Sequence, residues 1–226
     1  MKTTLPEPLS LPWKLKPVSW AQSGSETLAD GRRRFWVKED LLGITPAMLV
    51  WWFSHLEGDV EIEGRRLPRS RVWHPLDHVS VRYVRRAPDG SIGPGAQIAA
   101  CEFLGRNPHY KVDGVATIEK LDEEGFINTV AIGGFPLARL VHTFRQTSAG
   151  THFEHTLIVP GSWRFGLLGK LVVALRFSQA EGEVWLKHAI EEMGALEHFL
   201  PQLYECEMQR GERRSDVITS RGEDRS

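Results

Sequence analysis

The sequence predicts an α+β fold in which an antiparallel sheet curls around one long C-terminal helix. Between residues 79 and 159, short segments of alternating apolar and polar residues follow one another, separated by turn residues. From about residue 179 the apolar residues instead recur at spacings of three, four and seven, the period of a helix that buries one face. Strands that precede a helix, rather than alternating with helices, are typical of α+β domains.

The N-terminal third is predicted to contain an arm and one short helix. Residues 1–30 are rich in proline and include a Gln-Ser-Gly-Ser stretch, so we expect an extended arm that wraps the domain. Trp13 and Trp20 would dock this arm. Thr45 followed by Pro46 is a helix start signal, and the apolar residues after it predict a mostly buried helix.

The middle of the chain is predicted to form a sheet of about six strands within a single domain, residues 31–207. Residues 68–75, bounded by prolines, are expected to form a loop, and the charged segment 208–226 a disordered tail. The predicted strands are 79–84, Gln97–Leu104, Val115–Leu121, Phe126–Ile132, Ala138–Gln146 and Thr151–Val159.

Composition excludes several classes of function. The chain has 28 basic and 29 acidic residues, and this balance gives no overall field to attract nucleic acid or an anionic membrane. Its two cysteines provide neither a disulfide framework nor a cysteine-based zinc site. The N-terminus lacks the apolar core of a signal peptide, and no apolar run approaches the roughly 18 residues of a membrane span. We therefore expect an unexported, cytoplasmic protein.

His188 and Glu192 are the first candidates for a functional site. They stand four residues apart on the C-terminal helix and fall inside its apolar stripe, between Trp185 and Leu196. A carboxylate in a core must be paired, hydrogen-bonded, protonated or bound to a metal. Side chains four apart lie one above the other, so one imidazole and one carboxylate can converge on a single cation.

Further metal ligands would have to come from the sheet. The segment Trp73-His74-Pro75-Leu76-Asp77-His78 places two histidines and an aspartate just before a strand. Glu102 is an acidic residue inside the apolar strand AACEFLG. Two histidines with two glutamates would suit zinc better than calcium.

A simpler interpretation remains open for each of these residues. The pair on the helix could form an ordinary hydrogen bond, the histidines of segment 73–78 could cap loops, and Glu102 could pair with an arginine. The histidines of the late strands, His142, His152 and His155, are most often packing or exposed groups in such positions.

Two strings resemble a known enzyme family. WHPLDH (73–78) together with WLKHAIEEMGALEHFLPQLYE (185–205) resembles the 2,4-diacetylphloroglucinol hydrolase family, which includes phloretin hydrolase. The similarity runs from about Thr45 to Tyr204 and takes in the VHTF and GLLGKL segments. It implies a Bet v 1-like helix-grip fold and a zinc-dependent hydrolase that cuts the carbon–carbon bond between an aromatic ring and an acyl group.

The resemblance also implies roles for individual residues. His142 looks like the family's pocket histidine, which is implicated in proton transfer. His78 is preferred to His74 because the family's ligand stands at the end of the HPxDH string. A tyrosine expected eight residues earlier, near a substrate hydroxyl, is replaced by Ser70. The zinc ligands would be His78, Glu102, His188 and Glu192.

The sequence therefore predicts a hydrolase whose substrate is a small aromatic acylated phenol. Two alternatives remain: a non-catalytic carrier of a hydrophobic aromatic ligand, and a metal enzyme of another type, such as a cyclase or ester hydrolase, on the same scaffold. No nucleic-acid or membrane partner is expected, and assembly as a homodimer is left open.

Overall fold

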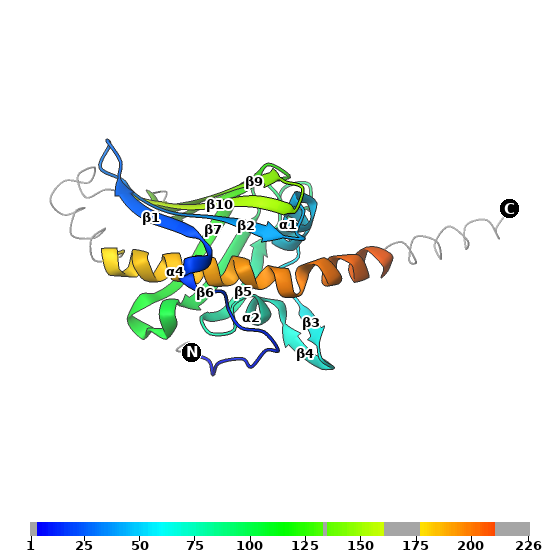
Figure 1. Cartoon of the computed structure of the whole chain (residues 1–226). Coiled ribbons are helices and arrows are strands. Elements are labelled where there is room, and N and C mark those ends of the chain that lie inside the picture. The colour runs from blue at the N-terminus through cyan, green and yellow to red at the C-terminus, as the bar shows by residue number, and fades with distance from the viewer. Residues whose placement is uncertain (1–3, 133–134, 161–176, 211–226) are drawn as a thin grey trace, which may run out of the picture.

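The computed structural model describes residues 4–132, 135–160 and 177–210, and its main feature is an antiparallel sheet bent around a long helix (Figure 1). The sheet has eight strands in the order β1-β2-β10-β9-β8-β7-β6-β5. Their bounds are Gln22–Thr27 (β1), Arg33–Leu42 (β2), His78–Arg85 (β5), Gln97–Phe103 (β6), Lys111–Asp122 (β7), Gly125–Ile132 (β8), Phe135–Gln146 (β9) and Gly150–Val159 (β10).

This arrangement confirms the predicted α+β, helix-grip fold class. All six predicted strands are present, and the sheet gains β1 and β2, which the prediction missed. β1 lies inside the segment expected to be an extended arm. Its sequence, QSGSET, has no apolar alternation, because an edge strand needs only backbone pairing, here with β2. A separate hairpin of β3 (Asp59–Ile62) and β4 (Arg65–Pro68) was also missed.

The long helix α4 spans Gln179–Ala195 and begins with a capping box. The Ser178 hydroxyl accepts a hydrogen bond from the Glu181 backbone N–H, and the Glu181 side chain accepts one from the Ser178 N–H. α4 packs against β2, where a Cβ on Gly182 would collide with the Phe35 ring. A 3-10 turn, η4 (Leu196–His198), interrupts the helical path before a further helical segment, 200–210.

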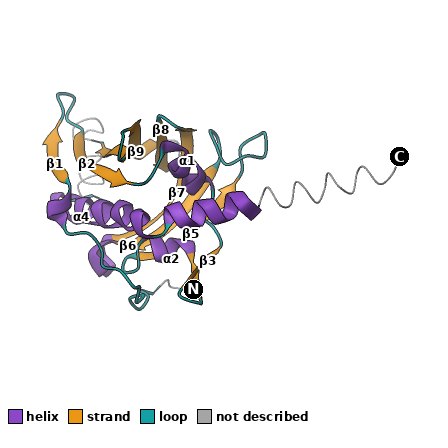
Figure 2. Ribbon diagram, turned by 45° about the vertical axis from the view of Figure 1, so that its right-hand side comes forward, coloured by secondary structure: helices purple, strands orange, loops and turns teal. Residues whose placement is uncertain are grey.

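Two short helices, α1 and α2, lie on opposite sides of α4 in Figure 2. α1 (Pro46–Ser54) starts as predicted, with Thr45 accepting from the Met48 N–H and proline at the first turn. α2 (Arg69–Trp73) occupies most of the segment expected to be a loop. The polypeptide runs directly from α2 into the turn His74–Asp77, so α2 positions that turn against α4.

The N-terminal arm lies beneath α4 in Figure 1 and is fastened at several points. Leu9 donates a backbone hydrogen bond to Pro75, and Trp13 stacks on His198 with ring centroids 5.4 Å apart. Lys16 pairs with Glu197 at 2.6 Å. Trp13 therefore docks as expected, whereas Trp20 is 49 % exposed.

The C-terminal boundary differs from the expected one. Residues 208–210 continue the helical segment, and the rest of the expected tail, 211–226, lies outside the described residues, as does the GLLGKL segment. Among the helices of the described ranges, none combines the length and the apolar character needed to cross a bilayer.

Candidate metal centre

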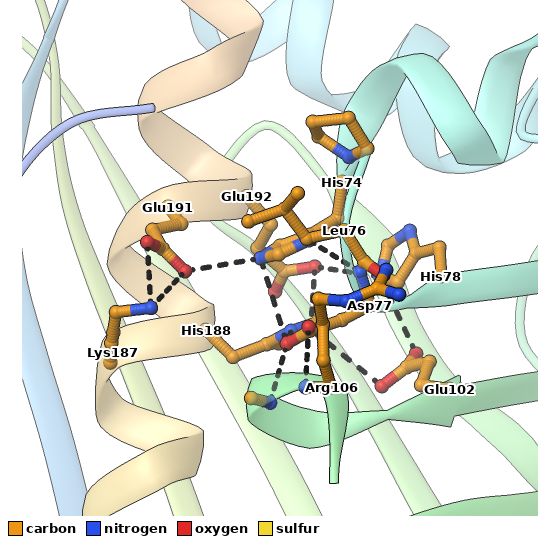
Figure 3. A network of polar contacts seen from close by, with 12 residues as sticks. His74, Leu76, Asp77, His78, Glu102, Arg106, Lys187, His188, Glu191 and Glu192 are labelled. Atoms are coloured by element: carbon orange, nitrogen blue, oxygen red, sulfur yellow. Dashed lines mark hydrogen bonds and ion pairs between the residues drawn. The ribbon is translucent and has the colours of Figure 1, made fainter. Parts of the chain in front are cut away.

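Three elements bring the four predicted ligands to one place (Figure 3). His78 is the first residue of β5, and Glu102 stands directly opposite it on β6. His188 and Glu192 lie one turn apart on α4 and point toward the two strand residues. His78, His188 and Glu192 are buried, and the Glu102 side chain is 17 % exposed.

Single ligand atoms of His78, Glu102 and His188 lie within 4.8 Å of one another, and Glu192 lies beside both histidines. The His78 Nε2 lies 3.6 Å from Glu102 Oε1 and 3.6 Å from Glu192 Oε2. The His188 Nε2 lies 3.6 Å from Glu102 Oε2 and 3.6 Å from Glu192 Oε2. These separations are too long for good hydrogen bonds. They are close to the roughly 3.4 Å that separates ligand atoms around a tetrahedral zinc with bonds of about 2.0–2.1 Å.

The outer nitrogens of both histidines are held by hydrogen bonds. The His78 Nδ1 is 2.8 Å from the backbone oxygen of Ser70, and the His188 Nδ1 is 3.0 Å from Asp77 Oδ2. Such bonds fix the tautomer and leave each Nε2 free to bind a metal. Within the described residues the His78 Nε2 has no hydrogen-bond partner although it is buried. The residues present therefore fit a zinc-like cation.

Asp77, which the sequence analysis named only as part of the segment 73–78 that could supply ligands, contacts a ligand histidine. Besides contacting His188, its carboxylate accepts hydrogen bonds from the backbone N–H groups of Gly105 and Arg106, at 2.9 and 3.1 Å. Burial opposes its ionisation, but the His188 hydrogen bond and the nearby imidazoles outweigh burial and lower the pKa of Asp77 to about 2. An ionised carboxylate behind His188 makes that imidazole a stronger ligand.

The alternative ligand, His74, belongs to a second group of side chains with Asp77 and His188. Here His74 Nδ1 accepts from the Asp77 N–H at 3.1 Å, His188 and Asp77 bind each other, and the His74 Nε2 faces Glu191 Oε2 at 3.4 Å, away from the Glu192 side of the cluster. The His74 ring stacks on His188 with centroids 4.3 Å apart. Burial, and then His188, lower the pKa of His74 to about 4. His74 therefore fits a packing role, and His78 fits the ligand role better.

Without a cation, the Glu192 carboxylate and the His188 imidazole of α4 stabilise each other's charge. Burial opposes the charge on each, but the neighbouring His188 and His78 imidazoles hold the pKa of Glu192 well below its usual value. Asp77 and Glu192 in turn hold the pKa of His188 well above its usual value. A metal ion would take the place of the His188 Nε2 proton, so its binding must release a proton and weaken as the pH falls.

We expect Asp77→Asn to weaken zinc binding by about 10- to 100-fold, because the His188 imidazole loses its carboxylate partner. The affinity is measured by competition with a chromophoric chelator. Asp113→Asn is the matched control, because Asp113 is exposed on β7, where it pairs with Lys111. An unchanged affinity in Asp77→Asn would mean that this carboxylate does not tune the site.

His142, the predicted proton-transfer residue, lies on the inner face of β9 and is buried among aromatic rings. Its ring is 4.0 Å from that of His155 and within 5.5 Å of the rings of Phe53, Phe126 and Phe153. Burial, and then His155, lower the pKa of His142 well below its usual value. An unperturbed histidine side chain titrates near neutral pH, but this apolar environment favours the neutral imidazole.

Two further buried polar residues lie on the inner face of the sheet: His155, which the sequence analysis interpreted as a packing or exposed group, and Glu39, which it did not consider. His155 stands opposite His142 on β10 and contacts the Trp185 ring at 4.7 Å. Glu39 lies on the inner face of β2. A signal for it exists in the sequence: Phe35, Val37 and Leu41 alternate along the strand, and Glu39 occupies the same apolar phase.

Burial raises the pKa of Glu39 to about 8, with Lys16 opposing the shift and Glu197 and Glu192 adding to it. Below pH 4.5 the Glu39 carboxyl is protonated in both the folded and the unfolded chain, so its contribution to the free energy of unfolding is fully present there. As the pH rises toward 8, Glu39 ionises readily only in the unfolded chain. This contribution to the free energy of unfolding is therefore lost.

The melting temperature of Glu39→Gln relative to the unmodified protein should therefore increase between about pH 5 and about pH 8. Thermal unfolding followed by circular dichroism at the two pH values measures this difference. Glu154→Gln, on the outer face of the neighbouring strand, should show no such change. A constant difference for Glu39→Gln would indicate that Glu39 is ionised in the folded protein.

Comparisons with known proteins add little to the identity of the site. No protein-family model and no curated protein matches the chain. Similar solved structures include Ara h 8.0201, at 14% identity and a TM-score of 0.48, covering 75% of this chain and 98% of that one. A START superfamily protein from Mycobacterium smegmatis has 14% identity and a TM-score of 0.46, with 76% and 98% covered. Protein Ms6760 from the same organism has 13% identity and a TM-score of 0.45, with 82% and 97% covered. Similarity at this level says nothing about the residues or the chemistry of the site.

Proposed function

We propose that the protein is a zinc-dependent hydrolase that cleaves the carbon–carbon bond between a polyphenolic ring and an acyl group. His78, Glu102, His188 and Glu192 would hold the metal. The observation that carries this proposal is the cluster of two imidazoles and two carboxylates, in which each Nε2 lies 3.6 Å from an oxygen of both glutamates. The reaction assigned to this cluster comes from the resemblance of the strings 73–78 and 185–205.

The reaction needs a polarised acyl group and a proton for the ring. It consumes one water: the acyl carbon gains an oxygen and leaves as a carboxylic acid, while the ring carbon gains a hydrogen. When bound, zinc supplies a Lewis acid that acidifies water and polarises a carbonyl. A ring with ortho and para hydroxyls can take up a proton at the acyl-bearing carbon and become a ketone, so the bond to be broken is that of a β-diketone.

His142 is the residue proposed to move that proton. Its Nδ1 is buried and has no hydrogen-bond partner among the described residues. A neutral imidazole can accept a proton from a phenolic hydroxyl and pass it to the ring carbon. The Phe53, Phe126 and Phe153 rings exclude water around His142, which would keep that imidazole neutral and able to accept the phenolic proton.

The proposal is tested by incubating the protein with 2-acetylphloroglucinol and measuring acetate and phloroglucinol. Equal amounts of the two products are expected, with release abolished by a chelator and restored by zinc. If the zinc-loaded protein forms no acid from this ketone or from homologues with longer acyl chains, the hydrolase assignment is wrong.

A carrier of an aromatic ligand is the second candidate. It is favoured by the aromatic surroundings of the inner sheet face, where Phe53, Phe126, Phe153 and Trp185 lie around the two stacked histidines. A carrier would bind the acylated phenol reversibly and return it unchanged, with or without zinc. The product assay therefore separates the two functions.

A further inference from the structure

The inner face of the sheet carries a row of polar side chains opposite α4. Glu39, His155 and His142 come from β2, β10 and β9, which are adjacent in that order. His155 is paired with His142 across β9–β10 and with Val37 across β2–β10, which places it diagonally next to Glu39. All three side chains are buried, at 4 % exposure or less.

This row differs from an ordinary buried polar cluster because its atoms lack partners. Both oxygens of Glu39, both nitrogens of His155 and the Nδ1 of His142 are buried without a hydrogen bond to any described residue. Lys16, the cation that acts on Glu39, is held by Glu197 at 2.6 Å. A protein rarely leaves so many buried donors and acceptors unpaired unless another molecule binds them.

The row borders the candidate metal centre. Glu192 acts electrostatically on Glu39, His142 and His155 alike. The Trp185 ring contacts His155 and precedes His188 by three residues on the same face of α4. A ligand that reaches the cluster of His78, Glu102, His188 and Glu192 from the sheet side would therefore lie against this row.

The row favours an uncharged ligand. Burial raises the pKa of Glu39 to about 8 and lowers the pKa of His155 to about 4, so near pH 7 both groups are neutral. A protonated carboxyl and a neutral imidazole each offer one donor and one acceptor, which matches hydroxyl groups. The flanking aromatic rings match a flat apolar body.

We propose that Glu39 and His155 recognise the hydroxyl groups of an uncharged aromatic ligand bound between the sheet and α4. The inference deepens the proposed function, because it concerns the substrate of the same site, but it requires no reaction. It assigns ligand specificity to two residues of β2 and β10 that neither hold the metal nor transfer the proton.

The test uses two simple probes, resorcinol and 1,3-dimethoxybenzene, which share a ring and differ in the ability to donate hydrogen bonds. Binding to the full chain is measured by isothermal titration calorimetry. The unmodified protein should bind resorcinol more tightly than the dimethoxy compound. Glu39→Leu and His155→Phe should each weaken resorcinol binding by about tenfold or more, because a ligand hydroxyl loses its partner, and should leave dimethoxybenzene binding unchanged.

Three controls separate recognition from a structural effect. Glu39→Gln keeps a donor and an acceptor and should restore most of the affinity that Glu39→Leu loses. Glu154→Leu, on the outer face of β10, should bind both probes normally. In the absence of ligand, Glu39→Leu should melt no lower than the unmodified protein, because it removes an unpaired buried carboxyl.

Wild-type affinity for resorcinol in both Glu39→Leu and His155→Phe would overturn the inference, as would equal affinity of the unmodified protein for the two probes or no binding of resorcinol. These outcomes are independent of the hydrolase proposal. If resorcinol binding depends on Glu39 and His155 but the protein neither binds zinc nor releases acid, the inference stands and the hydrolase assignment fails.

Discussion

Replacing Glu192 by glutamine is expected to lower the affinity for zinc by at least about a hundredfold. Loss of a partner that only supports a ligand typically costs 10- to 100-fold in metal affinity, so loss of a ligand should cost no less. Glutamine keeps the size of the side chain and removes its negative charge. Glu192 Oε2 lies 3.6 Å from the Nε2 atoms of both His78 and His188, so the substitution changes the group that faces both imidazoles. Zinc per chain is measured by atomic absorption after dialysis against a buffer of fixed free zinc.

Glu191→Gln is the matched control for this experiment. Glu191 is the adjacent residue on α4 and is also buried, but its carboxylate turns to Lys187 and His74, at 3.0 and 3.4 Å (Figure 3). This variant should retain zinc. If Glu191→Gln and Glu192→Gln lose equal amounts, or if neither loses any, Glu192 is not a ligand.

Replacing His142 by phenylalanine is expected to lower turnover of an acylphloroglucinol by about a hundredfold or more, the usual contribution of a proton-transfer residue. Bound zinc should be unchanged. Phenylalanine keeps an aromatic ring among those of Phe53, Phe126 and Phe153, so the packing around it should survive. Product release and zinc content are measured on the same preparation.

His152→Phe is the corresponding control, because His152 lies on the neighbouring strand but faces outward, where it pairs with Asp40 at 2.8 Å. It should turn over substrate normally. Normal turnover in His142→Phe would remove His142 from the mechanism, and loss of zinc in that variant would assign it a structural role instead.

The fold could be predicted wherever the hydrophobic pattern had a clear period. Strands β5 to β10 alternate, and the apolar stripe of α4 begins after a capping box that Ser178 and Glu181 form. β1 could not be predicted, because its residues are polar and its place in the sheet depends on pairing with β2. The short helix α2 was missed for a related reason: the prolines at either end of segment 68–75 also favour a loop.

The candidate site could be predicted where a charged residue occupied an apolar position. His188 and Glu192 stood out on the stripe of α4, and Glu102 inside an apolar strand. Glu39 carries the same signal on β2 but was overlooked, because that strand itself was not recognised. The partners of the ligands were beyond prediction: the bond from Asp77 to His188 joins residues 111 positions apart, and the acceptor for His78 is a backbone oxygen that carries no side-chain signature.

The most direct test of a metal centre at these residues is the zinc content of the full chain purified without added metal and without chelating resins. Atomic absorption is expected to give about one zinc ion per chain, and X-ray absorption at the zinc edge only nitrogen and oxygen neighbours at about 2.0–2.1 Å. Protein that contains no zinc and takes up none on dialysis would contradict the account, as would a sulfur neighbour at about 2.3 Å.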